Sequence, residues 1–528
     1  MNRQIYLDHA LAALPRVLSA LNRTKGMESF GCFDRNWWHY KITDFPSARM
    51  QEGVLTLAIL WKGEWSPYRS DEKIFECINA AIDFWISRQH RGGSVEEWYP
   101  GERSFVATAF SLYAVSETLL LIPELKNRQI LTAHIRRSAD WLLGRREETV
   151  TNQNSGALAA LYNAFLLTGD ERYRQASKNL ARFIASRQSS EGWFPEYGGP
   201  DIGYLSLTID YLAKYYLKSK DDEVKPMLEK ALEFISHFIH PDGSAGGIYA
   251  SRNTAYLIPS GFEALASEFP IAAAIAKKVR VGYQTNALPT PETLDDRYLL
   301  QNGYTFLQAH MTGLAREESN VPELPCETER TFQFPQAGIL VHSDSKVYFV
   351  VNTKKGGVFY LYDKEIGKGE SRGGLVLRRA KKVYVSGSLQ TRSGLTNDAP
   401  LTFLIQGSLV REKETKVSGT FFFLLRAAHV VFSFLPNGEQ FLKVFLRRVL
   451  ILNRRESRWK FSRKFIYQNG KLEVADYFPP HIFDKGYAGG YEEFVYVPSS
   501  RLFLGSQLNS DTRDISSADL KIGKVRVF

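Results

Sequence analysis

The chain has 528 residues, of which 44% are hydrophobic and 23% are charged. Its length excludes one ordinary hydrophobic core, so we expect a soluble globular protein with two or more domains. The net charge of +10 favours a polyanionic partner (an acidic glycan, nucleic acid or anionic lipid), and a basic surface without such a partner is the alternative.

Cysteine content and the apolar segments exclude several other classes. Cys32, Cys77 and Cys326 are far apart, odd in number and without metal-ligand spacing, so we expect no disulfide framework, metal or other cofactor. Residues 1–21 carry acidic and polar side chains within an apolar stretch, which is typical of an amphipathic helix and not of a signal peptide. The apolar stretch 421–434 contains an arginine and is too short to span a bilayer. We therefore expect a cytoplasmic protein.

The first 313 residues predict a helical domain. Apolar residues recur at helical spacing in the segments 5–21, 50–61, 72–90, 104–121, 126–143, 154–168, 171–187, 202–217, 222–239, 254–268, 270–280 and 296–312. The connections that follow the odd-numbered helices are long, namely 22–49, 91–103, 144–153, 188–201, 241–253 and 281–295. Alternate connections of an up-down helical array lie on the same side, so we expect these loops to share one face, where function usually lies.

An internal repeat supports a ring of helix pairs. Ala81–Gln89 reads AIDFWISRQ and Leu180–Gln188 reads LARFIASRQ. Each is followed by a loop with a Trp-aromatic-Pro sequence, at 98–100 and 193–195. Repeated helix pairs that close on themselves predict an α/α toroid of about six pairs, and an open solenoid is the alternative.

The second half of the chain predicts a different architecture. Residues 314–334 are polar and are typical of an interdomain linker. From 335 to 528 the pattern has period two, with Gly and Asn turns, which predicts an antiparallel β-sandwich. Its candidate strands are 337–342, 346–352, 357–362, 374–379, 382–388, 401–410, 415–425, 441–452 and 492–497. The expected fold class is thus multidomain α and β, with the toroid in residues 1–313.

The first candidate site segment is the aromatic loop at 30–49. It contains Trp37, His39 and Tyr40 beside a second tryptophan and a lysine. Aromatic faces stack on sugar rings, and His and Lys side chains bind carboxylates. The alternative is an aromatic plug that closes the toroid.

A second candidate is the pair Asn152 and Asn154, near the start of a predicted helix. Their amides can donate hydrogen bonds to a substrate carboxylate. Capping of the helix by Asn154 is the alternative.

The third candidate, Glu191–Tyr204, carries the most chemistry. Gly198 and Gly199 allow the backbone to approach a ligand closely. The acid–base groups of this segment lie in sequence beside Trp193 and are Glu196, Tyr197, Asp201 and Tyr204. For Asp201 alone, capping of the following helix is the favoured role.

The fourth candidate, Gly247–Tyr256, contains Arg252, which can form a two-pronged pair with a carboxylate. Asn253 and Tyr256 are further candidates for substrate binding. The alternatives are a helix cap for Asn253 and a core position for Tyr256.

A basic stretch in the second half can contact a polyanion or the surface of a membrane, and water-facing strand residues are the simpler interpretation. It comprises Arg447, Arg448, Arg454, Arg455, Arg458, Lys460, Arg463 and Lys464. The sequence has no Walker loop, dinucleotide fingerprint, HExxH or nucleophile elbow, and no recognisable nucleic-acid-binding module.

Together these features resemble the heparinase II/III-like family, which contains uronate polysaccharide lyases and, in related architecture, uronyl C5-epimerases. The resemblance depends on 152–154, on 196–204 and on the Phe-Pro-x-x-Gly stretch 334–338 at the start of the sandwich. It implies that Asn152 or Asn154 neutralises a uronate carboxylate, and that Tyr204 or Tyr197 acts as acid or base.

The chain departs from the family pattern in the first β-sheet, where family lyases commonly carry a histidine. The corresponding stretch 355–362 has none. His342 lies nearby in the sequence, and His39 is a substitute from the toroid.

The resemblance implies a carbon–oxygen lyase that removes the C5 proton of a uronic acid and cleaves the chain by β-elimination. A uronyl C5-epimerase that acts during polysaccharide assembly shares the first half of this reaction. A glycoside hydrolase would need two carboxylates, and a catalytically inactive glycan-binding protein is a further alternative. The expected partner is an acidic polysaccharide or oligosaccharide and not a nucleic acid, with peripheral membrane contact through the basic β-domain surface.

Overall fold

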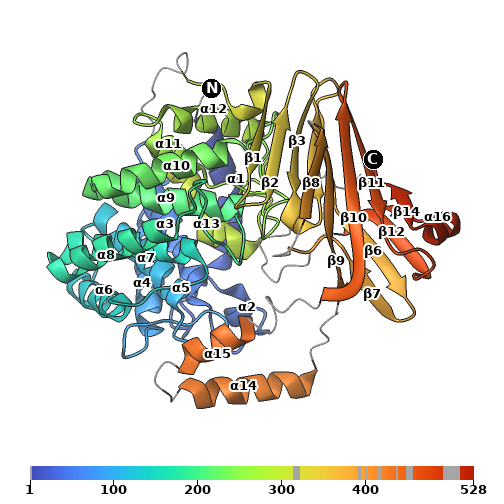
Figure 1. Cartoon of the computed structure of the whole chain (residues 1–528). Helices are drawn as coiled ribbons and strands as arrows, with labels where there is room; N and C mark the ends of the chain where they lie inside the picture. Colours follow the sequence, from blue (N-terminus) through green and yellow to red (C-terminus); the bar gives the residue numbers. More distant parts are fainter. Residues whose placement is uncertain are drawn as a thin grey trace.

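A computed structural model describes residues 3–312, 321–389, 394–399, 401–412, 418–433, 435, 438–447, 456–491 and 512–528. A helical toroid occupies the N-terminal part, and two antiparallel sheets lie beside it (Figure 1).

The described part of the toroid contains an inner ring of six helices. They are α3 (Gly53–Lys62), α5 (Phe105–Leu121), α7 (Thr151–Thr168), α9 (Ile202–Ser219), α11 (Pro259–Leu265) and α13 (Asp296–Met311). Each packs against the next, and α13 packs back against α3, so the ring is closed. The outer helices are α1 (Gln4–Ala20), α4 (Glu72–Ser87), α6 (Arg128–Leu142), α8 (Glu171–Arg187), α10 (Lys225–Ser236) and α12 (Pro270–Gln284). The predicted toroid is therefore confirmed, and the open solenoid is wrong.

Burial explains which helices form the inner ring. Helix α5 is apolar on all sides and is buried along most of its length, whereas α8 buries a single stripe from Tyr173 to Ile184. A helix that is apolar all round needs neighbours on every side, and a helix with one apolar stripe needs only one.

Aromatic side chains fill the axis of the toroid. The hydroxyls of Tyr211 and Tyr304 lie 2.8 Å apart, and the rings of Phe110 and Tyr113 each lie 5.0 Å from that of Tyr211. The ammonium group of Lys214 lies 4.7 Å from the centroid of the Tyr211 ring. These side chains form a floor, so the toroid is a cup and not a channel.

The first sheet has the order β1-β2-β3-β4-β5 and is antiparallel throughout. Its strands are β1 (Arg330–Phe334), β2 (Ile339–Ser343), β3 (Val347–Asn352), β4 (Val358–Asp363) and β5 (Lys368–Arg372). The first strand thus begins inside the segment 314–334 that was expected to be a linker.

The second sheet has the order β13-β12-β6-β7-β9-β10-β11-β14, with β8 paired to β9. Its strands are β6 (Gly374–Arg379), β7 (Lys382–Val385), β8 (Gly394–Ala399), β9 (Thr402–Glu412), β10 (Glu456–Gln468), β11 (Lys471–Tyr477), β12 (Lys485–Tyr491), β13 (Arg513–Asp514) and β14 (Lys524–Arg526), and α16 (Ser517–Ile522) precedes β14. The antiparallel sandwich is confirmed.

The first sheet is buried on both faces. Tyr348 and Val350 of β3 pack against the core of the toroid, whereas Phe349 and Val351 pack against the second sheet. Successive side chains of a strand point to opposite faces, so a sheet between two layers is apolar at nearly every position.

Two predicted strands, 415–425 and 441–452, are wrong where the structure describes them. Helices α14 (Gly419–Ser433) and α15 (Gly438–Arg447) occupy these positions. The short apolar run 421–425 fits a buried strand and a helix equally well by periodicity, which explains the first error. Residues 441–447 instead place their apolar side chains at helical spacing, so the second prediction misread the period. The predicted strand 492–497 lies outside the described residues. Within the described ranges, every helix is too short or too polar to traverse a bilayer.

Candidate active site at the rim of the toroid

The long connections meet at the N-terminal ends of the inner helices. The amide of Ala48 donates to the carbonyl of Glu96 at 2.9 Å, which joins loop 22–49 to loop 91–103. The amide of Ser251 donates to the carbonyl of Pro200 at 2.9 Å, which joins loop 241–253 to loop 188–201. These loops form one rim at this end of the toroid.

Asn152 and Glu196 meet at this rim and are both buried. Asn152, in the first turn of α7, donates its backbone N–H and its side-chain Nδ2 to the two Glu196 carboxyl oxygens, at 3.0 and 2.9 Å. Burial raises the pKa of Glu196 to about 8, the charge of Asp201 adds to that rise, and the hydrogen bonds from Asn152 oppose it. Near neutral pH, Glu196 therefore holds a proton most of the time.

Asp201 joins helix α9 to loop 241–253. Its carboxylate accepts the backbone N–H of Tyr204 at 3.2 Å and that of Arg252 at 2.9 Å. It also accepts the hydroxyl of Thr254. The capping role considered for Asp201 is confirmed, and these bonds hold Tyr204 and Arg252 at the same end of the helical array.

Arg252 is 2% exposed, and its guanidinium carbon lies 4.1 Å from the centroid of the Tyr197 ring. Its Nε and Nη2 atoms have no hydrogen-bond partner among the described residues. A buried cation with unpaired donors is costly unless an anion arrives to accept them. Arg252 is therefore a buried side chain with donors that no described residue accepts.

The backbone is unusual beside Arg252. Tyr197 has a φ of +56° and Gly198 a φ of +100°, and the left-handed region is uncommon for a tyrosine. A side chain at Gly199 would meet those of Ser251 and Leu389. The close neighbours of Gly199 are thus side chains of this protein, one of them from the segment that follows β7, and the approach of a ligand to this glycine pair stays a prediction.

The Tyr204 ring lies edge-on to the Tyr256 ring at 6.3 Å, and Tyr256 in turn contacts the Tyr298 ring at 5.9 Å. Tyr256 is buried, as the core alternative expected. Of these three tyrosines, Tyr204 lies in the first turn of α9.

Asn154 and Asn253 are occupied by other contacts. The Asn154 side chain accepts the N–H of Glu147 at 2.9 Å and donates to its carbonyl at 2.7 Å, so it fastens loop 144–153. Asn253 does not cap a helix, because α11 begins at Pro259. Its side-chain oxygen accepts the ammonium group of Lys355.

Lys355 is a residue that the sequence reasoning missed. It ends a 3-10 turn, Thr353–Lys355, between β3 and β4, and it also donates to the carbonyl of Ala250 at 2.7 Å. Its side chain is buried. The sequence pattern that could have identified it is a lysine between two apolar strands. It is the first residue of the stretch 355–362, in which the resemblance implied a histidine.

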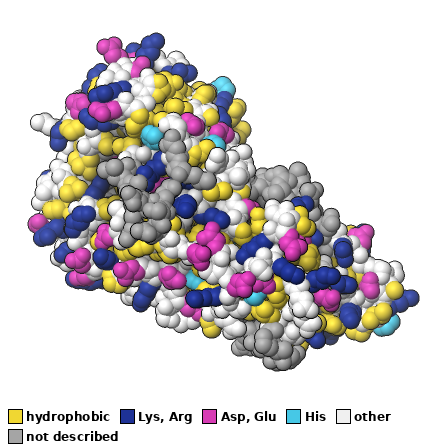
Figure 2. Space-filling view, turned by 90° about the horizontal axis from the view of Figure 1, so that it is seen from above, with side chains coloured by type: hydrophobic (Ala, Val, Ile, Leu, Met, Phe, Trp, Pro, Cys, Tyr) yellow, Lys and Arg dark blue, Asp and Glu magenta, His cyan; other side chains and the backbone are white. Residues whose placement is uncertain are grey.

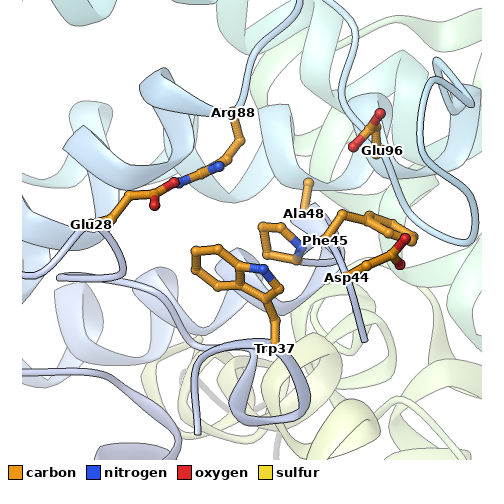
Figure 3. Close-up of a pocket in the computed structure, with 8 residues that line it drawn as sticks. Glu28, Trp37, Asp44, Phe45, Ala48, Arg88 and Glu96 are labelled. Atoms are coloured by element: carbon orange, nitrogen blue, oxygen red, sulfur yellow. The ribbon is translucent and has the colours of Figure 1, made fainter. Parts of the chain in front are cut away.

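The aromatic loop forms a separate part of the rim, shown in Figure 3. Trp37 borders a cavity of about 370 Å³ that Glu28 and Arg88 also line, and those two form an ion pair at 2.8 Å. The short helix α2 (Arg35–Trp38) positions Trp37. The floor of tyrosines already fills the axis, and the role of the loop as a plug at the end of the toroid stays an alternative.

His39 and Tyr40 are exposed, and their ring centroids lie 5.0 Å apart. Across the part of the chain that the structure describes, no hydrogen bond, ion pair or ring contact joins either residue to Tyr204 or Arg252. The structure therefore does not place His39 beside the candidate catalytic tyrosine.

Trp193 contributes to the joint between the domains. Its indole N–H donates to Glu191 at 2.9 Å, and the same carboxylate accepts the backbone N–H groups of Gln336 at 2.6 Å and Ala337 at 2.9 Å. The Phe-Pro-x-x-Gly stretch thus contacts the loop of the third candidate segment.

His342 cannot replace the missing histidine. Its ring contacts Phe349 at 5.0 Å and Tyr467 at 4.9 Å, and both belong to the core between the two sheets. Alternation along β2 directs His342 away from the toroid.

Two ion pairs at the rim were also missed. Arg297, in the first turn of α13, pairs with Glu97 across the rim, and Arg49 pairs with Glu52 within the 3-10 turn Ala48–Glu52. Burial raises the pKa of Glu52 to about 6, although its pairing with Arg49 opposes the rise. Within the described residues, no three His, Cys, Asp or Glu side chains converge to hold a metal ion.

Comparison with known proteins places this architecture. No family model matches the sequence, and no curated protein matches it. Among solved structures, the xanthan lyase of Paenibacillus matches with a TM-score of 0.52 and 11% identity over 92% of this chain, which corresponds to 46% of the lyase. The Streptomyces coelicolor A3 chondroitin AC lyase in complex with chondroitin sulphate matches with a TM-score of 0.56 and 9% identity, over 92% of this chain and 68% of that one.

This chain therefore spans less than half the length of the xanthan lyase. The match extends over both the helical part and the sheets. The chain has the fold of these polysaccharide lyases, an α/α toroid followed by antiparallel sheets.

Proposed function

We propose that the chain is a polysaccharide lyase that acts on a glycan containing uronic acid, by removal of the C5 proton and β-elimination. The observation that carries this proposal is Arg252, a buried guanidinium with unpaired donors at the rim of the cup. A uronate carboxylate supplies the acceptors that Arg252 lacks. Because a guanidinium is planar, it binds such a carboxylate with two parallel hydrogen bonds.

Neutralisation of the carboxylate is the first requirement of the chemistry. Loss of the C5 proton places a second negative charge on the uronate, so donors directed at its carboxylate stabilise the transition state. Arg252 provides positive charge, and the Asn152–Glu196 pair lies beside it. Protonated Glu196 adds no repulsion, which favours a substrate anion at this position.

Tyr204 is our choice for the proton-transfer group. As a phenolate, its oxygen takes the proton from C5. The electron pair of the C5–H bond forms the C4–C5 double bond, the C4–O bond breaks, and the resulting phenol gives the proton to the leaving oxygen. Tyr197 is instead a platform for the guanidinium of Arg252. Asn152 is the neutralising amide, because both polar groups of the Asn154 side chain are already bound to Glu147.

A glycoside hydrolase is less well supported. Hydrolysis needs two carboxyl groups that flank the bond, and Asp201 is enclosed by donors from Tyr204, Arg252 and Thr254. Glu97 is similarly held by Arg297. A uronyl C5-epimerase needs the same carboxylate neutralisation and differs only in the return of a proton to C5.

The deciding experiment is incubation of the full chain with a panel of uronate glycans in deuterated water. A lyase produces chain ends with an unsaturated uronate that absorbs in the near ultraviolet, with no mass added. An epimerase incorporates deuterium at C5 without cleavage, and a hydrolase adds water. If binding is detected but none of these changes occurs, the proposal of catalysis is wrong.

A further inference from the structure

The turn between β3 and β4 contacts the toroid loop that carries Arg252. The ammonium group of Lys355 donates to the carbonyl of Ala250 at 2.7 Å and to the side-chain oxygen of Asn253. These two acceptors lie on either side of Arg252 in the sequence. Two points of the loop that flank Arg252 are therefore fixed to one side chain of the first sheet.

Lys355 differs from the basic residues at the surface. On the face shown in Figure 2, Lys and Arg side chains lie among acidic ones and are open to solvent, whereas Lys355 is 1% exposed. Burial of an ammonium group is costly unless acceptors of the protein replace its water. The Ala250 carbonyl and the Asn253 side chain are such acceptors, so burial of this charge ties the position of Lys355 to that of the loop.

The backbone at Asn253 adds to the importance of this contact. Asn253 has a φ of +57°, in the left-handed region, which asparagine adopts more often than most other residues. Lys355 holds the side chain of the residue that has this conformation. Because this left-handed residue directly follows Arg252, its conformation influences where the guanidinium points.

The toroid holds the same loop from its other side. The Asp201 carboxylate accepts the backbone N–H of Arg252 at 2.9 Å, and the Ser251 hydroxyl donates to the carbonyl of Glu196 at 2.8 Å. Lys355 supplies the contact from the sheet. A loop that is held from both domains loses little freedom when its side chain binds a ligand, and such pre-organisation increases affinity and rate.

The second sheet fixes the turn that carries Lys355. Arg463 of β10 donates to the carbonyl of Gly357 at 2.9 Å, and it pairs with Asp476 through two hydrogen bonds of 2.7 Å. Both of these charged side chains are fully buried. Within the turn, the Asn352 side chain accepts the backbone N–H of Lys355 at 2.9 Å. Lys355 therefore extends from a rigid base.

We propose that Lys355 is a positioning residue of the carboxylate site. It holds the loop from Ala250 to Asn253 so that the unpaired donors of Arg252 are in place before the substrate arrives. This inference rests on the proposed function, because it assigns those donors to a uronate carboxylate. The first sheet thereby contributes to the reaction without contacting the reacting atoms.

Hydrogen exchange in the absence of glycan tests the positioning itself. Lys355→Met keeps a similar apolar stem and removes the ammonium group. We expect the amides of 247–254 to exchange about ten-fold faster than in the parent, as measured by mass spectrometry on the full chain. Lys354→Met is the matched control, since this neighbouring lysine donates to the carbonyl of Gln336 at 2.6 Å in an exposed position, and it should leave the segment unchanged. Unchanged exchange in Lys355→Met would overturn the proposal.

A double-mutant cycle tests whether Lys355 acts through Arg252. We expect Lys355→Met to lower kcat/KM on a uronate glycan by about ten-fold, and by less than about two-fold when Arg252→Lys is already present. A residue that only stabilises the fold would lower kcat/KM by the same factor in both backgrounds. Equal factors are therefore the second result that contradicts the proposal. Lys354→Met should match the parent throughout.

Asn253→Gly tests the same contact if Lys355→Met proves unstable. It keeps the lysine and removes its side-chain acceptor, and glycine adopts a φ of +57° without strain. We expect the same faster exchange and the same dependence on Arg252, and parent-like behaviour in both assays would refute the role of Lys355. A parent chain that neither binds nor cleaves a uronate glycan refutes the proposed function and the substrate role of Lys355 with it. Since exchange of the loop is measured without glycan, the two failures are distinguishable.

Discussion

Arg252 is a buried side chain with unpaired donors, and our proposal assigns those donors to a substrate carboxylate. We predict that Arg252→Lys lowers kcat/KM on the correct glycan by about 10²-fold or more, because an ammonium group cannot reproduce the two-pronged geometry. Arg182→Lys, at an exposed pair with Glu223, is the control and should leave kcat/KM unchanged. Steady-state kinetics at matched protein stability measure the effect. Full activity of the Arg252 variant would refute the assigned carboxylate site.

The two tyrosines of the third segment allow a matched comparison. We predict that Tyr204→Phe abolishes turnover and leaves the thermal midpoint nearly unchanged, because only the phenolic hydroxyl transfers the proton. Tyr197→Phe keeps the aromatic face under Arg252 and should retain most activity. The reverse pattern would transfer the catalytic role to Tyr197, and activity in both variants would remove tyrosine from the mechanism.

Glu196 makes stability depend on pH. Its pKa of about 8 in the folded chain lies above the ordinary value of 4.5, so the folded state keeps a proton that the unfolded state releases. Its contribution is complete below pH 4.5 and is lost as pH rises through about 8. We predict that Glu196→Gln has a thermal midpoint close to that of the parent at pH 5 and a higher one at pH 9. A difference that does not change with pH would show that Glu196 is ionised throughout. Glu365→Gln, on the surface, is the control.

At the scale of a single helix, the first turn of α7 carries two asparagines with different roles. Asn154 is structural, and Asn152 has the proposed chemical role. The buried Asn154 side chain binds both backbone groups of Glu147, so Asn154→Ala should cost about 1–3 kcal/mol of unfolding free energy. Chemical denaturation measures this loss. Residual activity per folded molecule should stay near that of the parent, and a large specific loss would contradict the structural assignment.

The sequence predicted helices better than it predicted their contacts. Helical spacing located the twelve helices of the ring, because inner and outer helices each bury apolar residues at that period. It also brought Asn152, Tyr204 and Arg252 to one end through the alternation of long and short loops. It failed at α14, where residues 421–425 are all apolar and have no period to distinguish helix from strand.

Residue pairings across the rim could not be predicted from the sequence, for a physical reason. Lys355 contacts Asn253 only because the first sheet packs against the toroid, and no local pattern encodes that docking. Trp193 illustrates the converse, since its loop position suggested stacking on a sugar while its indole is bound to Glu191 at the domain joint.

At the scale of the whole molecule, the net charge of +10 predicts how glycan binding responds to salt. Raising the ionic strength from about 0.01 M to about 0.15 M shortens the Debye length from about 30 Å to about 8 Å. We therefore predict that the Kd for an acidic oligosaccharide rises several-fold over this range, measured by isothermal titration calorimetry. A neutral oligosaccharide should show no such change. Salt-independent affinity would exclude a polyanion as the partner.

The closure of α13 onto α3 has a consequence for biosynthesis. These helices are separated by more than 230 residues, so a ribosome releases most of the inner ring before the segment that completes it emerges. Until then the nascent polypeptide is an open crescent, and the Tyr211–Tyr304 contact cannot form. Contacts between residues so distant in sequence slow folding. A chain truncated before α13 should therefore be an aggregation-prone intermediate that depends on chaperones.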